Sequence, residues 1–165
     1  MKNDAKNLLK KILGSYDQKL AEEERLAAEK RAADAAFPDR FATLKTSTIR
    51  PAIQEFADVL NGHGHEVTAR EQQESSSTAG GVSYAAISLR IIPKPFAHKS
   101  AETNKSFIEI TFSANRSERK ITVSSTNTMI NSGGSLGKRG EYEIDAVTTD
   151  VVADHVLQTL QEALK

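Results

Sequence analysis

The segment from residue 81 to residue 129 constrains the fold of this chain most strongly, because its apolar residues recur at every second position. The first such run comprises Ala85, Ile87, Leu89 and Ile91. In a β-strand this spacing places all of these side chains on one face. Pro93 cannot donate a hydrogen bond to a neighbouring strand, so we expect the strand to end near Ile92.

Two further runs repeat the alternation and predict a β-hairpin. Their apolar members are Ile108, Ile110 and Phe112 in the first run, and Ile121 and Val123 in the second. The polar segment 115–118 separates the runs and has the length and composition of a hairpin turn. The intervening positions carry Ser, Thr, Glu and Lys. This pattern is typical of an antiparallel sheet with one covered face and one face open to water.

Two helices are predicted to cover the apolar face of this sheet. The first has an apolar stripe at three- and four-residue steps: Phe37, Phe41, Leu44, Thr48, Ala52, Ile53, Phe56, Val59 and Leu60. Pro51 should kink or restart it near Arg50, and Asn61-Gly62 should end it. The second follows a cap at Thr148 or Thr149 and carries Val152, Val156, Leu160, Ala163 and Leu164 on one side. We therefore expect an α+β fold in two layers, with a four- or five-stranded antiparallel sheet and helices on one face.

The connecting segments are interpreted as one additional strand at each end of the sheet and three loops. Residues 66–73 form the first strand, with Val67 and Ala69 inward, and residues 142–144 form a short last strand. We expect loops at 74–81 and 93–105, and a glycine-rich loop at 131–140, because Gly and Ser are frequent in turns.

A long helical arm is predicted over residues 1–36, which leaves 37–165 for the α+β domain. Leu9, Leu13, Tyr16 and Leu20 follow the heptad spacing of a coiled coil, which later continues in a shifted register. The arm is so polar that its stability requires a partner surface. We expect it to form a homodimer. The alternatives are that it lies on its own domain or projects freely, and Pro38 is expected to start a new helix or to kink the chain.

The composition excludes several classes of protein. The chain has 165 residues, no cysteine and a formal net charge of zero, so disulfides and cysteine-based zinc sites are excluded and the total charge does not favour nucleic acid. No apolar run is long enough to cross a membrane. We expect a cytoplasmic protein without a membrane partner.

Two weak candidate sites remain. His63 and His65 could share a metal if the backbone between them were extended and a third ligand came from elsewhere. A helix exit in which Gly62 and Gly64 supply the turn is the preferred interpretation, so we predict no metal and no cofactor. If the loops at 93–105 and 131–140 are neighbours, they collect a basic rim suited to a phosphate or carboxylate. This rim comprises Lys94, His98, Lys99, Lys105, Lys138 and Arg139.

The function favoured by these patterns is a non-catalytic interaction and oligomerisation module. It would self-associate through the arm and could bind a protein partner on the hydroxyl-rich open face of the sheet. A nucleic-acid or phosphate-binding protein that uses the basic rim is the first alternative. An enzyme with an unrecognised site is the second, although no Gly-x-Ser-x-Gly motif is present.

Overall fold

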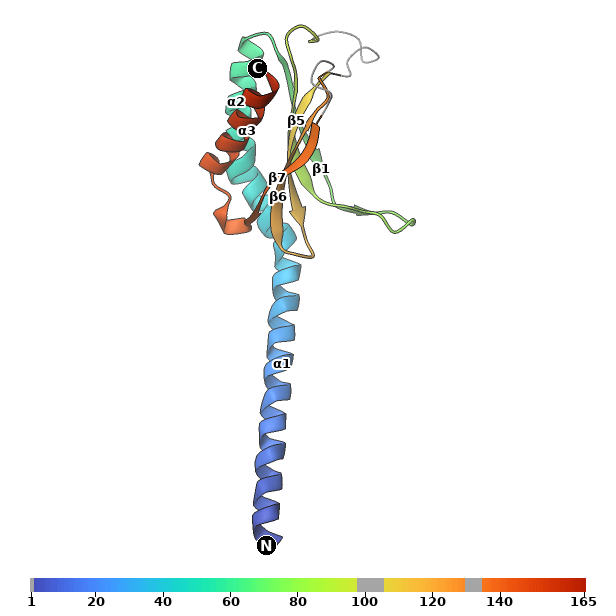
Figure 1. Cartoon of the computed structure of the whole chain (residues 1–165), viewed down its shortest axis with the longest axis vertical. Coiled ribbons are helices and arrows are strands. Elements are labelled where there is room, and N and C mark those ends of the chain that lie inside the picture. The colour runs from blue at the N-terminus through green and yellow to red at the C-terminus, as the bar shows by residue number, and fades with distance from the viewer. Residues whose placement is uncertain (1, 98–105, 130–134) are drawn as a thin grey trace. The chain divides into compact units, whose positions relative to one another are not determined.

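The chain adopts an α+β fold with a five-stranded antiparallel sheet, a small two-stranded sheet and helices at both ends of the sequence (Figure 1). A computed structural model describes residues 2–97, 106–129 and 135–165. The strand order in the larger sheet is β1-β4-β5-β6-β7, with every neighbouring pair antiparallel. The predicted fold class is therefore confirmed, with five strands in the main sheet.

The elements have the following bounds. The helical segments are α1 (Lys2–Leu44), the π-helix η1 (Lys45–Ile49), α2 (Arg50–Gly62), the 3₁₀-helix η3 (Ile144–Ala146) and α3 (Thr149–Ala163). The strands are β1 (Glu66–Gln72), β2 (Ser75–Ser76), β3 (Val82–Ser83), β4 (Ala86–Ile92), β5 (Ile108–Asn115), β6 (Lys120–Asn127) and β7 (Ser135–Glu143).

The chain divides into two compact units, which comprise residues 1–37 and 38–165. We call the first the arm and the second the domain, and each is described by itself. Helix α1 supplies the whole arm and continues through Pro38, so the expected start of a new helix at that proline is wrong. A single proline removes one amide donor from the helix, and the surrounding turns tolerate this loss.

The apolar alternation in β4, β5 and β6 separates a covered face of the sheet from an open one. In β5 the burial alternates strictly, because Ile108, Ile110 and Phe112 are inaccessible while Glu109 and Thr111 are half-buried. The covered face also holds Ile87, Leu89, Ile91, Ile121 and Val123, all at most 1% exposed. Removing this area from water stabilises the fold by about 25 cal/mol per Å².

Helices α2 and α3 pack beside each other on one side of the sheet (Figure 1). The predicted stripes supply the contacts, since Ile53, Val152 and Val156 are fully buried. Val59 and Leu164 are exceptions, because they are 61% and 44% exposed despite their places in the expected stripes. Thr148 caps α3 by accepting a hydrogen bond from the amide of Val151, as the sequence predicts.

The irregularity expected near Arg50 is confirmed, and it takes the form of a π-turn. The Arg50 amide donates to the carbonyl of Lys45, five residues earlier, and Pro51 occupies the first turn of α2. A proline has no amide hydrogen and its ring collides with the carbonyl four residues before it. Widening the preceding turn relieves this collision and keeps the segment helical.

The predicted glycine-rich loop at 131–140 is wrong over its described part. Strand β7 begins at Ser135, pairs with β6 and ends at Glu143, with a bulge in the register at Val123 and Ser124. A Cβ atom at Gly140 would lie 2.9 Å from the ring of Tyr142. The glycine therefore allows a close approach within a strand and does not mark a turn.

The segment 74–81 contains the outer hairpin of the domain. Ser75 and Ser76 in β2 pair with Ser83 and Val82 in β3. The flanking strands β1 and β4 pair directly with each other along their whole length. This pairing makes β1 the edge strand of the larger sheet, next to β4.

Candidate interaction surfaces

The arm exposes an apolar stripe of large side chains. Seven of them are between 40% and 60% exposed: Leu8, Leu9, Ile12, Leu13, Tyr16, Leu20 and Leu26. Steps of three and four residues place most of these side chains on one side of α1. Isolated apolar side chains are common on protein surfaces, whereas a contiguous stripe is typical of an interaction site.

Charge is distributed unevenly along the arm. Residues 2–20 contain five lysines and two aspartates, whereas residues 21–37 contain five acidic and three basic residues. Part of the negative charge in residues 21–37 is neutralised within the helix, because the Arg25 guanidinium pairs with Glu22 and Glu29. The same guanidinium lowers the pKa of Glu22.

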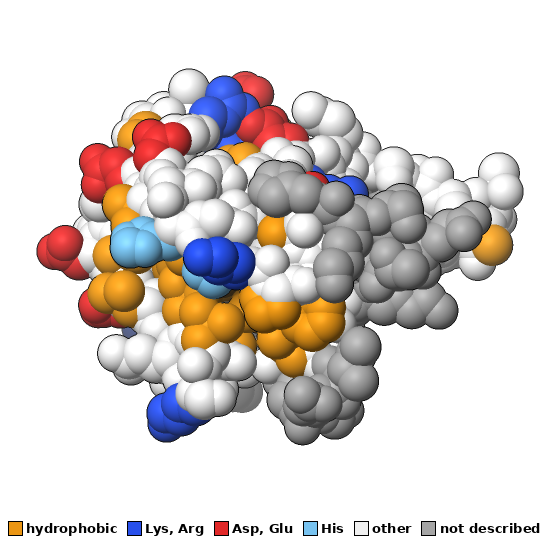
Figure 2. Space-filling view, turned by 90° about the horizontal axis from the view of Figure 1, so that it is seen from above, with side chains coloured by type: hydrophobic (Ala, Val, Ile, Leu, Met, Phe, Trp, Pro, Cys, Tyr) orange, Lys and Arg blue, Asp and Glu red, His pale blue; other side chains and the backbone are white. Residues whose placement is uncertain are grey.

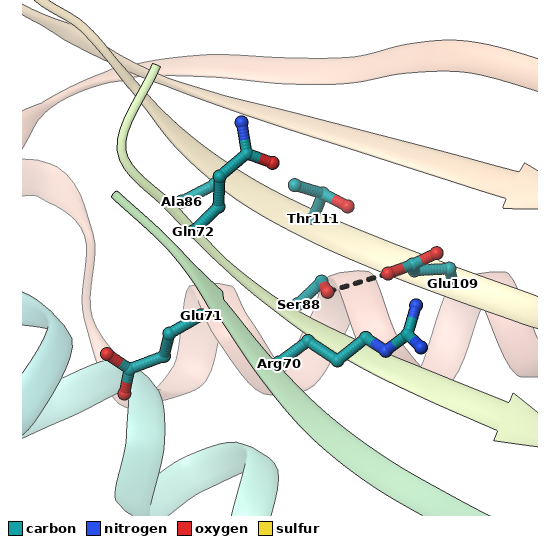
Figure 3. A pocket seen from close by; sticks show the side chains of 7 residues that line it. All are labelled: Arg70, Glu71, Gln72, Ala86, Ser88, Glu109 and Thr111. Carbon is teal, nitrogen blue, oxygen red and sulfur yellow. Dashed lines mark hydrogen bonds between the residues drawn. The ribbon is translucent and has the colours of Figure 1, made fainter. Parts of the chain in front are cut away.

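The open face of the sheet carries a hollow with a volume of about 650 Å³ (Figure 3). Strands β1, β4 and β5 supply its lining, which comprises Arg70, Glu71, Gln72, Ala86, Ser88, Glu109 and Thr111. The register explains this grouping, because Arg70 lies opposite Ser88, and Ser88 lies opposite Thr111. The hollow is therefore a shallow polar surface across three strands.

Hydrogen bonding is the chemistry available in this hollow. The Ser88 hydroxyl donates to a carboxylate oxygen of Glu109 at 2.7 Å. Glu71 points away from these side chains toward the helices, as Figure 3 shows, and it pairs with Lys45 at 3.0 Å and with Arg50. The lining contains no histidine, lysine or cysteine. It therefore presents hydrogen-bond donors and acceptors to a ligand.

Two residues of the predicted basic rim lie in a strand and not in a loop, while the binding of an anion by the rim stays a prediction. Lys138 and Arg139 are adjacent residues of β7, and Arg139 is the residue that the bulge leaves without a partner in β6. Lys138 pairs with Glu141, which also binds Lys120 at 3.2 Å. Both ammonium groups lower the pKa of the Glu141 carboxyl. The remaining predicted residue of the described part is Lys94, while His98, Lys99 and Lys105 lie outside the described residues.

Arg139 makes its contacts on the helix-covered side. Its Nε donates to the Ser125 hydroxyl at 2.6 Å, and its terminal nitrogen pairs with Glu162 of α3 at 2.6 Å. This cation therefore joins the last strand to the last helix and lowers the pKa of the Glu162 carboxyl.

The two histidines near the end of α2 have separate surroundings. Nδ1 of His65 accepts a hydrogen bond from the backbone amide of Lys94 at 3.1 Å. Figure 2 shows histidine side chains beside basic and apolar ones on the face of the molecule seen from above. Within residues 2–97, 106–129 and 135–165, no three His, Cys, Asp or Glu side chains group as metal ligands would.

A buried polar pair between β7 and α3 escaped the sequence analysis. The Tyr142 hydroxyl lies 2.6 Å from Nε2 of His155, and the two rings meet edge to face with centroids 5.6 Å apart. Burial is the main cause that lowers the pKa of His155, and the nearby Arg139 charge adds to it. One signal was available: His155 lies three residues after Val152, on the apolar stripe of its helix.

Comparisons with protein families, with curated proteins and with solved structures find no match to this chain. None of the described helices combines the length and the apolar character that a membrane span requires.

Proposed function

We propose that this protein is a non-catalytic interaction module that forms a homodimer through the apolar stripe of α1. The observation that carries the proposal is the exposure of large apolar side chains along one side of the arm, including Leu9 at 55% and Tyr16 at 57%. Burying such a side chain contributes about 1.5–3 kcal/mol. Association at micromolar concentration requires about 8 kcal/mol of free energy. Several such side chains buried on each of two chains supply this amount.

The polar character of the arm supports pairing with a second helix. A helix as polar as α1 stabilises itself weakly in water, because most helical stability in proteins comes from packing an apolar face. Pairing two copies supplies that packing without any change in the domain. We further propose that the open face of the sheet offers a second contact surface, in which side chains such as Ser88 and Thr111 bind a polar partner.

Phosphate or nucleic-acid binding has weaker support. Lys138 and Arg139 each pair with a carboxylate, from Glu141 and Glu162 respectively. An anion would have to displace these carboxylates before it gained the same charge-assisted contacts. The chain is also neutral as a whole, so long-range attraction to a polyanion is weak.

Substitutions within the full-length chain test the dimer. The double variant Ile12→Glu/Tyr16→Glu places carboxylates on the apolar stripe, and we expect its molar mass by light scattering to fall to that of a monomer. Asn7→Glu/Gln18→Glu is a matched control, since it introduces the same number of carboxylates on the opposite side of the same helix. Its mass should remain that of the unmodified protein.

An unmodified chain with the monomeric mass of 18.0 kDa at 100 μM would contradict the proposal. Equal loss of mass in both double variants would also contradict it, because the apolar stripe would then have no specific role. Circular dichroism of each variant checks that the domain remains folded, since the sheet and α3 do not depend on these positions.

A further inference from the structure

We infer that the two copies pair in antiparallel orientation along α1, with Lys19 of one chain opposite Glu23 of the other. This inference rests on the proposed self-association and specifies its partner surface. Three features of the arm support it: the charge difference between its halves, the polar residues within its apolar seam, and the sizes of the residues that this orientation brings together.

The first feature is a charge distribution that opposes the helix dipole. Anionic side chains stabilise the N-terminal end of a helix and cationic ones destabilise it. Lys2, Lys6, Lys10 and Lys11 nevertheless occupy the first three turns of α1, where Asp4 is the single acidic residue, and most of the acidic residues come later. A second helix in antiparallel orientation would bring its residues 21–37, which carry five acidic and three basic side chains, alongside the lysine-rich residues 2–20. A parallel one would place lysines against lysines.

The second feature is the composition of the seam, by which we mean the residues that face the second helix at heptad spacing. Starting at Ala5, steps of four and three residues give Ala5, Leu9, Ile12, Tyr16, Lys19, Glu23, Leu26, Lys30 and Ala33. In a parallel homodimer each seam residue meets its own copy. Lys19 would then meet Lys19, and Glu23 would meet Glu23, with like charges in contact.

The antiparallel orientation pairs these residues with opposite charges. If Lys19 lies opposite Glu23, the partner of every other seam residue is also fixed. The two chains run in opposite directions, so the residue numbers of any opposing pair add up to the same value as 19 and 23 do. Each dimer then contains the Lys19–Glu23 contact twice. A polar pair at the seam also favours one register over shifted ones.

The third feature is complementarity of size. The same register places Leu9 opposite Ala33 and Tyr16 opposite Leu26, so that large side chains meet smaller ones. Ile12 lies opposite Lys30, whose aliphatic stem can cover it while the ammonium group reaches water. Leu9, Tyr16 and Leu26 are each at least 50% exposed in the single chain, and the pairing would bury them.

The seam through Leu13 and Leu20 does not offer a better parallel dimer. Its heptad positions continue to Lys6 on one side and to Glu23 and Lys30 on the other. Each of these charged residues would meet its own copy in a parallel pair. Like charges in direct contact destabilise such interfaces.

Because the chain contains no cysteine, cross-linking between single cysteines gives a direct test. Full-length Leu9→Cys and Ala33→Cys are prepared separately, mixed, and oxidised at a concentration where light scattering shows dimers under reducing conditions. We expect a disulfide between residues 9 and 33 in the mixture, identified by peptide mass spectrometry, and little covalent dimer from either variant alone. Disulfides from 9 to 9 and from 33 to 33 would overturn the antiparallel orientation while leaving self-association intact.

A charge exchange provides an independent measurement. Lys19→Glu should weaken the dimer by about tenfold in Kd, because two carboxylates then face each other, and Lys19→Glu/Glu23→Lys should restore it. In a parallel pair, Lys19→Glu would only replace a contact between two lysines by a contact between two glutamates, so the Kd would not change. An unchanged Kd would therefore overturn the inference. A monomeric mass for the unmodified chain would refute the proposed function itself.

Discussion

The Tyr142 hydroxyl lies 2.6 Å from Nε2 of His155 in the contact between β7 and α3. His155 is 7% exposed, and its buried Nδ1 has no hydrogen-bond partner among the residues that the structure describes. Protonation would leave an unpaired N–H donor at Nδ1 and would place a buried charge beside Arg139. Both facts make protonation of this histidine unfavourable in the folded chain.

We predict that stability falls as the pH is lowered through the range in which His155 would otherwise be protonated. Its folded-state pKa is lowered from the ordinary value of 6.5, so the unfolded chain binds the proton more readily. The contribution to stability is complete above pH 6.5 and is lost as the pH falls from there toward the folded-state pKa. Urea unfolding between pH 8 and pH 5 measures this change.

The variant His155→Gln should show a smaller loss of stability over the same pH range, although it is less stable at pH 8. His63→Gln is the control, because this histidine is exposed and its substitution should leave the pH dependence unchanged. A parallel pH dependence in the unmodified protein and His155→Gln would refute the assignment.

Adjacent residues of β7 give a second prediction. Arg139→Ala removes the donor to Ser125, which is 4% exposed, and should destabilise the domain by about 1–3 kcal/mol because a buried hydroxyl loses its partner. Lys138→Ala removes an exposed ion pair with Glu141 and should cost less than about 1 kcal/mol. Chemical denaturation of both variants at pH 7 tests the difference. Equal losses would contradict it.

The cap of α3 gives a third prediction. The Thr148 hydroxyl accepts a hydrogen bond from the Val151 amide at 3.3 Å, so Thr148→Ala should destabilise the domain by about 1 kcal/mol. Thr149→Ala is the control, since this residue already lies within the helix and alanine has the higher helix propensity. Thermal unfolding should show a lower Tm for the first variant only.

Periodicity allowed the covered face of the sheet and its two helices to be predicted from the sequence, because burial imposes a regular spacing on residues such as Ile110 and Ile53. Glycine was misleading at Gly137 and Gly140, which lie in β7 but were interpreted as part of a loop. At Gly140 the missing Cβ atom permits close packing against Tyr142. The contacts of Tyr142, Arg139 and Glu71 could not be predicted. Each joins residues distant in sequence, and no local pattern specifies which partner a polar side chain will meet.

The last prediction concerns Glu71, which joins β1 to the π-helix. Its carboxylate pairs with Lys45 at 3.0 Å and with Arg50. The Lys45 side chain is only 11% exposed, so removing its counter-ion leaves a charge nearly out of water. We expect Glu71→Gln to destabilise the domain by about 3 kcal/mol, since breaking a buried pair costs more than forming it gains.

A double-mutant cycle separates this effect from simple loss of packing. Lys45→Met keeps the volume of the side chain and removes its charge, so we expect Glu71→Gln to cost less than about 1 kcal/mol in that background. Glu55→Gln, at an exposed position of α2, is the control for the chemical change itself. If Glu71→Gln costs the same in both backgrounds, Lys45 and Glu71 are not coupled, and the ion pair does not determine how β1 is held against the π-helix.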